Sequence, residues 1–180
     1  FPNHAPNPEN AEAMESISNA VKASGADFGI IFDTDVDRAG CVGKGGFEIN
    51  RNRLVALASK VALDSCNGGT IVTDSVTSDG LAEFIANNGG VHLRFKRGYR
   101  NVINKQIELE KNGIKCPLAM ETSGHAAFAE NYYLDDGAYL ITKLIIEAAS
   151  LAKEGKALND LIENLREPVE EKEMRFKILC

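Results

Sequence analysis

The sequence is poor in positive charge, in long apolar runs and in cysteines at metal-binding spacing. It has 20 Lys and Arg against 26 Asp and Glu, and the resulting net charge of −6 argues against nucleic acid or an acidic membrane as partner. No apolar stretch approaches the roughly 20 residues of a membrane span, and no signal-peptide pattern is present. The cysteines are expected to be reduced thiols, as in intracellular proteins. We therefore expect a soluble intracellular protein, in the cytoplasm or in an organelle.

The two ends of the chain have the features of a cut polypeptide. The sequence opens at Phe1 instead of Met, and residues 175–180 form an apolar ending. Its 180 residues suit one full globular domain and part of another. We therefore expect a fragment, in which any targeting segment upstream of Phe1 would be missing.

Helices and strands alternate in the pattern of the sequence. After an irregular opening that contains three prolines, apolar residues at helical spacing predict a helix over residues 10–24, which Gly25 ends. The other predicted helices span residues 52–66, 79–87, 100–111, 137–153 and 158–165. The predicted strands span residues 27–32, 40–42, 70–73, 91–95 and 117–120. This alternation predicts an α/β fold, with a largely parallel twisted sheet covered by helices on both faces and ligands at the carboxyl ends of the strands.

A cluster of carboxylates follows the first predicted strand. The apolar run that begins at Gly29 ends in Asp33, Asp35 and Asp37, and Arg38 comes next. On a straight strand, alternate residues lie about 6.6 Å apart, whereas oxygens that share a Mg²⁺ ion each lie about 2.1 Å from it. The chain must therefore curl here to bring the carboxylates together. The planar guanidinium of Arg38 suits phosphate oxygens, so the segment predicts a divalent metal beside a phosphorylated ligand.

Three other readings of this segment compete with the metal site. A calcium loop needs Gly at its sixth and Glu at its twelfth position, where this chain has Arg38 and Lys44. A dehalogenase-type phosphatase would use Asp33 as nucleophile and Asp35 as acid/base, but it should have Thr or Val where Asp37 stands. A solvated acidic turn is the third reading. Three carboxylates at a buried strand end would then repel one another with no cation to offset the cost. The phosphatase and the acidic turn remain open.

Two later loops also follow predicted strands. Residues 95–100, Phe-Lys-Arg-Gly-Tyr-Arg, precede a helix and could hold a phosphate or form a solvated basic turn. Residues 121–125, Glu-Thr-Ser-Gly-His, combine a carboxylate, two hydroxyls and an imidazole, which suit a polyol. If this second segment is extended, Glu121 and Ser123 face the same way. His125 taken by itself is more typical of a hydrogen-bonded structural histidine than of a catalytic base.

The three loops together resemble the α-D-phosphohexomutase family, which includes phosphoglucomutases and phosphomannomutases. Residues 33–38 resemble the metal loop at the end of the family's second domain, and residues 121–125 resemble the Glu-x-Ser-Gly-His sugar loop of its third domain. Residues 1–9, 96–99 and 136–137 are similar to further family segments in the same order. The resemblance implies that residues 1–44 end domain 2, that residues 45–166 form domain 3, and that residues 167–180 lead to a missing C-terminal domain.

The resemblance also implies an activity and a set of site residues. The complete enzyme would interconvert hexose 1-phosphate and hexose 6-phosphate through a phosphoserine and a bisphosphate intermediate. Its partners would be hexose phosphate, hexose bisphosphate and the missing domains of the same polypeptide. The residues implied are Asp33, Asp35 and Asp37 for Mg²⁺, Arg38 and His125 for catalysis, and Glu121, Ser123, Gly98, Tyr99 and Arg100 for substrate binding.

One family motif is missing from the sequence. No Ser in this chain is followed by His-Asn-Pro, as in the family's serine loop. The chain by itself is therefore expected to be inactive. A phosphatase with Asp33 as nucleophile, and a non-catalytic sugar-phosphate-binding module, stay as alternatives. The sugar can be glucose, mannose or an amino sugar.

Overall fold

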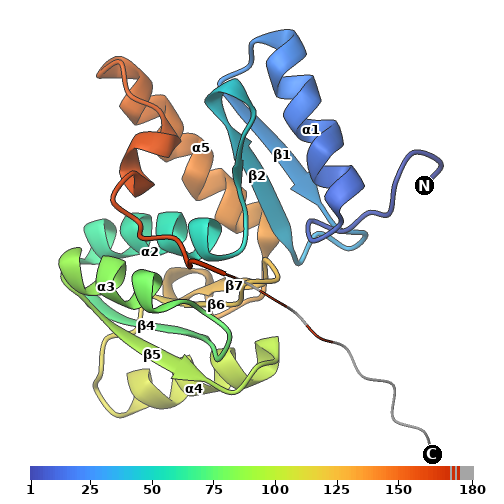
Figure 1. Ribbon diagram of the computed structural model, residues 1–180. Helices are drawn as coiled ribbons and strands as arrows, with labels where there is room; N and C mark the ends of the chain where they lie inside the picture. The colour runs from blue at the N-terminus through green and yellow to red at the C-terminus, as the bar shows by residue number, and fades with distance from the viewer. Residues whose placement is uncertain (171, 173, 175–180) are drawn as a thin grey trace, which may run out of the picture.

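Two sheets and the helices around them make up residues 1–170, 172 and 174, which are the residues that this computed structural model describes (Figure 1). The apolar ending at residues 175–180, and with it part of the predicted linker, lies outside them. The helices are α1 (Ala11–Ser24), α2 (Asn52–Cys66), α3 (Asp79–Asn87), α4 (Tyr99–Lys111) and α5 (Gly137–Lys153). The strands are β1 (Phe28–Phe32), β2 (Ala39–Gly43), β3 (Phe47–Ile49), β4 (Gly69–Asp74), β5 (Gly90–Phe95), β6 (Leu118–Met120) and β7 (Ala126–Phe128).

The first sheet is antiparallel, with the strand order β1-β2-β3. Helix α1 covers one of its faces through a small apolar cluster that includes Met14, Val21 and Val42. The helix begins after Asn10, whose side chain accepts a hydrogen bond from the third residue on. It ends at Gly25, which takes the left-handed conformation at φ 67°. The prediction that Gly25 ends this helix is therefore confirmed.

The second sheet has the order β5-β4-β6-β7. Strand β4 runs parallel to β5 and to β6, and β7 pairs with β6 in the antiparallel sense. The prediction of an α/β fold with a mostly parallel sheet is confirmed. Two short strands, β3 and β7, were not predicted. The helix predicted over residues 158–165 starts at the predicted residue but is a short 3-10 helix, Leu158–Ile162, and ends three residues early. Its start is fixed by the Asp160 carboxylate, which accepts a hydrogen bond from the Ala157 N–H.

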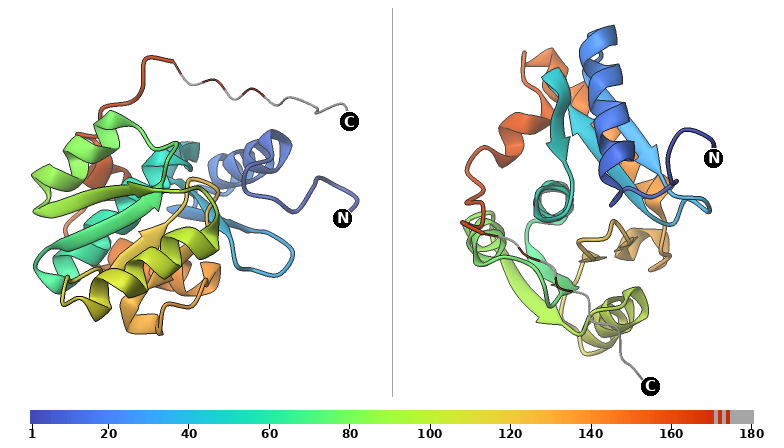
Figure 2. Two further views of the ribbon diagram at one scale, coloured as in Figure 1. Left: turned by 90° about the horizontal axis from the view of Figure 1, so that it is seen from below. Right: turned by 45° about the vertical axis from the view of Figure 1, so that its right-hand side comes forward.

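Helices cover both faces of the second sheet (Figure 2). Helices α2, α3 and α5 lie on one side, and α4 lies on the other over a separate cluster that includes Val72, Val102 and Ala119. Helix α5 also contacts β1 and β2. One apolar core therefore runs without a break from the first sheet through α2 and α5 to the second sheet. No helix in the part of the chain that the structure describes has the length and apolar character to cross a membrane.

Three loops that contain predicted site residues start at the carboxyl ends of strands. Residues 33–38 follow β1, residues 96–98 follow β5 and residues 121–125 follow β6. The backbones of Arg38 and His125 form an antiparallel bridge, so the first and third loops lie against each other. The fold therefore brings together segments that are more than 80 residues apart in the sequence.

Candidate functional site

Residues 33–38, here called the metal loop, connect the antiparallel strands β1 and β2. The Asp33 N–H donates to the Arg38 carbonyl at 3.3 Å and closes the loop, while Val36 takes a left-handed conformation at φ 66°. The loop curls enough that ligand oxygens of Asp33, Asp35 and Asp37 all lie within 4.8 Å of one another. Asp33 is buried, Asp37 is half-buried and Asp35 is exposed. Three carboxylates can therefore converge on one point at the open side of the loop.

Arg38 holds the buried end of this loop. Its Nε donates to Asp33 Oδ2 at 2.8 Å and its backbone N–H donates to Asp33 Oδ1 at 3.2 Å. Burial raises the pKa of Asp33, but the hydrogen bonds and charge of Arg38 outweigh it, so the pKa lies below its usual value. A second donor, Nη1, reaches Asn7 Oδ1 at 3.3 Å. Arg38 thus keeps Asp33 ionised and ties the metal loop to the N-terminal segment.

Asp37 lies in a less favourable electrostatic environment. Burial raises its pKa, the charge of His125 opposes this, and the nearby Asp33 and Asp135 raise it further, with a net upward shift. Like charges that are held this close disfavour full ionisation. A bound divalent cation would relieve the repulsion, and the donor set of three carboxylate oxygens is the kind that Mg²⁺ or Ca²⁺ prefers. The residues present therefore fit a hard divalent cation.

Residues 121–125, here called the sugar loop, form a tight turn between β6 and β7. The Glu121 N–H donates to the His125 carbonyl at 2.9 Å, and the Gly124 N–H donates to the Glu121 carbonyl at 3.1 Å. The segment is therefore not extended, because the β6–β7 hairpin closes across it. The common facing of Glu121 and Ser123, which assumed an extended segment, does not follow from this geometry.

Glu121 is a buried carboxylate at the end of β6, with 4% of its surface exposed. Its Oε1 accepts from the Gly98 N–H at 2.5 Å, so the sugar loop is bound to the loop that follows β5. Burial raises the pKa of Glu121, and the bond from Gly98 opposes that effect without cancelling it. The Ser123 hydroxyl oxygen is buried and has no hydrogen-bond partner among the described residues. Both side chains therefore keep polar atoms that a ligand could satisfy.

The loop after β5 brings an aromatic ring to the site. Gly98 has φ 116°, which side chains rarely adopt, and helix α4 begins directly after it at Tyr99. The Tyr99 ring stacks on the His125 imidazole, with centroids 5.0 Å apart and planes at 21°. Arg100 is exposed, and its Nε donates to the Tyr99 hydroxyl at 3.1 Å. Gly98 and Tyr99 thus lie at the sugar loop, and Arg100 lies at its rim.

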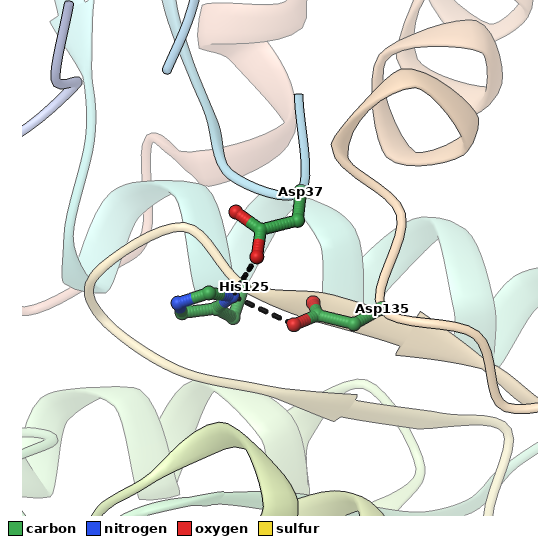
Figure 3. Close-up of side chains that lie close together, drawn as sticks. All are labelled: Asp37, His125 and Asp135. Atoms are coloured by element: carbon green, nitrogen blue, oxygen red, sulfur yellow. Dashed lines mark hydrogen bonds and ion pairs between the residues drawn. The ribbon is translucent and has the colours of Figure 1, made fainter. Parts of the chain in front are cut away.

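His125 is bound through one ring nitrogen to a residue that the sequence did not single out (Figure 3). Its Nδ1 lies 2.7 Å from Asp135 Oδ2 and 3.7 Å from Asp37 Oδ2. Burial by itself lowers the pKa of His125, but the bond to Asp135 and the charges of Asp135, Asp37 and Glu121 outweigh it, so the pKa is raised. Asp37, a residue of the metal loop, therefore also lies beside His125 of the sugar loop.

Asp74, at the end of β4, is, after Asp135, the second residue at the site that the sequence did not single out. Asp74 is fully buried, and its Oδ2 accepts a hydrogen bond from the Thr122 hydroxyl at 3.0 Å. This bond ties the sugar loop to the end of β4. The one signal that could have drawn attention to it was its position after a buried strand. Asp135 offered a weaker signal, since its contact with His125 depends on how the chain folds between them.

Backbone contacts join the metal loop, the sugar loop and the N-terminus of α5. The Ala39 N–H donates to the Gly124 carbonyl at 3.3 Å, and the Gly137 N–H donates to the Val36 carbonyl at 3.1 Å. A Cβ on Gly137 would lie 2.8 Å from that same carbonyl oxygen, so the close approach needs glycine there. The N-terminus of α5, with the positive end of its dipole, therefore lies directly on the metal loop.

Comparison with known proteins matches most of the chain to one family. Residues 50–169 match the family described as phosphoglucomutase/phosphomannomutase, alpha/beta/alpha domain III, and residues 1–46 match its alpha/beta/alpha domain II. The phosphomannomutase/phosphoglucomutase of Pseudomonas syringae pv. tomato is 33% identical over 179 residues, which are 99% of this chain and 37% of that protein. The protein of the same name from Pseudomonas putida is 36% identical over 146 residues, 81% of this chain and 30% of that protein.

A solved structure shows the same fold. The crystal structure of a phosphoglucomutase/phosphomannomutase family protein from Burkholderia thailandensis superposes with a TM-score of 0.78 at 33% identity. The superposition covers 94% of this chain and 35% of that one. This chain thus spans between 30% and 37% of the length of these three proteins.

Proposed function

This chain belongs to the phosphoglucomutase/phosphomannomutase family, and on that premise we propose that it is the metal-binding and sugar-binding part of a phosphohexomutase. The whole enzyme would move a phosphoryl group between the 1- and 6-positions of a hexose phosphate, through a phosphoserine and a bisphosphate intermediate. One observation carries the proposal. The three clustered carboxylates of the metal loop are joined through the Arg38–His125 bridge to a turn with a buried carboxylate and a hydroxyl that has no hydrogen-bond partner in the described part of the chain.

The metal loop supplies the charge that phosphoryl transfer needs. Asp33, Asp35 and Asp37 would hold Mg²⁺, which when bound neutralises negative charge on phosphoryl oxygens. Arg38 keeps Asp33 ionised through two hydrogen bonds, and the rest of its guanidinium can attract a phosphate. The N-terminus of α5 adds positive potential at the same place. The loop is thus arranged to hold a cation and an anionic group together.

The sugar loop supplies orientation. Glu121 and Ser123 would bind sugar hydroxyls. The Glu121 carboxylate is held in place by the hydrogen bond from the Gly98 N–H to its Oε1. The Ser123 hydroxyl has no partner among the described residues. His125, stacked on Tyr99, would be the partner of a phosphate or of a transferred proton. Gly98, Tyr99 and Arg100 would line the substrate from the β5 side. The sugar is a hexose phosphate of the glucose, mannose or amino-sugar type.

The geometry disfavours the alternative in which Asp33 is the nucleophile of a phosphatase. Both Asp33 oxygens accept hydrogen bonds from Arg38, and 8% of the residue is exposed. A carboxylate that is held in this way has little freedom to attack phosphorus, whereas it can still share an oxygen with a metal ion. The buried position therefore favours the role of ligand.

The test uses the full-length polypeptide with Mg²⁺ and glucose or mannose 1-phosphate. We expect the hexose 6-phosphate to appear with almost no release of inorganic phosphate, and the phosphorylated residue, mapped by mass spectrometry, to be a serine. Release of phosphate, with the label on Asp33, would instead establish the phosphatase. Binding of the sugar phosphate without turnover by the full-length protein would support the non-catalytic module.

A further inference from the structure

The guanidinium of Arg38 is held at two of its three nitrogens. Its Nε donates to Asp33 Oδ2 at 2.8 Å, and its Nη1 donates to Asn7 Oδ1 at 3.3 Å. No hydrogen bond in the described part of the chain involves the third nitrogen, Nη2, and 24% of the side chain is exposed. Because a guanidinium is a rigid plane of N–H donors, contacts at two nitrogens fix the plane and leave the third for an anion.

We propose that Asn7 is the residue that positions Arg38, holding Nη1 so that Nη2 faces a phosphoryl group of the bound sugar phosphate. This inference rests on the proposed function, and it adds a residue of the N-terminal segment to those that shape the site. Asn7 contacts no reacting atom. It accepts a hydrogen bond from Arg38 and acts through it.

The Asn7 side chain is held in place independently of Arg38. Its Oδ1 also accepts from the Glu9 N–H at 2.9 Å, the bond that an Asn side chain makes to the backbone two residues on in a turn. The Asn7 N–H donates to the Ala5 carbonyl, and the Asn7 carbonyl accepts from the Asn10 N–H, each at 2.9 Å. The position of the acceptor oxygen is therefore set by the local backbone.

The N-terminal segment is in turn seated on the first sheet. Pro8 is buried, and its carbonyl accepts from Asn50 Nδ2, directly after β3, at 2.8 Å. A Cβ on Gly40, in β2, would lie 3.1 Å from the Pro8 Cβ, so the proline packs closely against that strand. Asn7 is therefore attached to the same sheet that carries the metal loop.

The neutral amide of Asn7 suits the charge of Arg38. The Asp33 carboxylate already accepts from Nε, and Asp37 Oδ1 lies 3.9 Å from the same nitrogen. A third carboxylate at the guanidinium would compete with a phosphate for it, whereas an amide oxygen orients the group without adding negative charge. Asn7 therefore fixes the guanidinium plane and leaves its positive charge for an anionic ligand.

The first measurement uses the 180-residue chain with ¹⁵N-labelled arginine. A guanidinium that is held at Nε and Nη1 rotates slowly about its Nε–Cζ bond, so Nη1 and Nη2 give separate signals, which an Arg38→Lys variant assigns. We expect separate signals in the wild type and in Asn7→Asp, which keeps the acceptor oxygen, and merged signals in Asn7→Ala.

The matched control is Asn10→Ala, which removes the side-chain cap of α1 from the same segment and should leave the Arg38 signals separate. Separate signals in Asn7→Ala overturn the proposal. Merged signals in the wild type also overturn it, whether or not any variant folds.

The second measurement is a double-mutant cycle in the full-length polypeptide with Mg²⁺ and glucose or mannose 1-phosphate. Asn7→Ala should lower kcat/KM about tenfold, within the roughly two- to 150-fold range of couplings between residues in contact. In an Arg38→Lys background the same substitution should have almost no further effect, because the group that it positions is gone. An equal effect in both backgrounds would mean that Asn7 only supports the fold, and the proposal would be overturned. If the wild-type protein itself does not interconvert the sugar phosphates, the proposed function fails, and the arginine spectra still decide whether Asn7 holds Arg38.

Discussion

Replacing Gly124 by alanine tests whether the contact between the sugar loop and the first sheet holds the site together. Gly124 has φ 102°, and a Cβ there would lie 2.5 Å from the Ala39 carbonyl oxygen and 3.2 Å from the Ala39 nitrogen. Both neighbouring atoms are backbone atoms at the start of β2, so neither can rotate away. The Ala39 N–H is also the donor to the Gly124 carbonyl at 3.3 Å. The substitution must therefore push the sugar loop away from the start of β2.

The expected cost is the sum of three effects. An L-residue in the left-handed region costs about 1–2 kcal/mol. A forced backbone shift of the overpacking kind typically costs about 1–3 kcal/mol. Loss of the hydrogen bond from Ala39 adds about 0.5–1.5 kcal/mol. We expect Gly124→Ala to lower the free energy of unfolding by about 3 kcal/mol or more.

Gly113→Ala is the matched control, because Gly113 also has positive φ, at 77°, but a Cβ there would have no atom within 4 Å. Its cost should be limited to the backbone effect of about 1–2 kcal/mol. Urea unfolding of the 180-residue chain, followed by circular dichroism, measures both variants. At a typical slope of about 2 kcal/mol/M, the two midpoints should differ by about 1 M. Equal midpoints would show that the sugar loop does not press on β2 and would refute this description of the site.

Four further predictions concern the binding of Mg²⁺, the role of Glu121, the pH dependence of stability and the activity of the chain by itself. Asp35→Asn removes one of three anionic ligands, so calorimetry on the 180-residue chain should show Mg²⁺ affinity lowered at least about tenfold, with Asp64→Asn on α2 as the unaffected control. Glu121→Gln in the full-length enzyme should lower kcat/KM about ten- to a hundredfold with either phosphate isomer, because a charge-assisted hydrogen bond contributes about 1.5–3 kcal/mol; unchanged values would remove Glu121 from the sugar site. Burial lowers the pKa of His92 to about 4, below the unfolded value near 6.5, so the unfolded chain binds the proton more readily and stability falls as the pH drops from about 6.5 toward 4. His92→Gln should lack about 1–3 kcal/mol of that loss in denaturant titrations at pH 7 and pH 4.5. The 180-residue chain by itself should not interconvert glucose 1-phosphate and 6-phosphate in a coupled assay, because it has no Ser-His-Asn-Pro segment; measurable turnover would contradict this.

Regular elements could be predicted from the sequence where one periodic signal was strong. Helices α2, α3 and α5 have the predicted bounds of residues 52–66, 79–87 and 137–153, since each has apolar residues at helical spacing and is bounded by turn residues. The strands β3 and β7 were not found in this way, because each has three residues and no room for alternation; β6 is as short, and it was predicted only as the apolar run that leads into residues 121–125. The pairing of Arg38 with His125 is set by tertiary packing, which no local pattern encodes.

The features that escaped the sequence are those that local rules disfavour. Asp74 is a fully buried carboxylate whose pKa burial raises, Ser123 has a buried hydroxyl without a partner among the described residues, and Val36 is a β-branched residue in the left-handed region. Each of these costs folding free energy, and all three lie on or beside the metal loop and the sugar loop. Such costs also occur away from the two loops, as at the buried hydroxyl of Ser59 and at Asn67, whose φ is 55°. What distinguishes Asp74, Ser123 and Val36 is their place at the carboxyl ends of strands, where the α/β fold positions ligands, and this is an argument for a binding site that does not depend on any sequence motif.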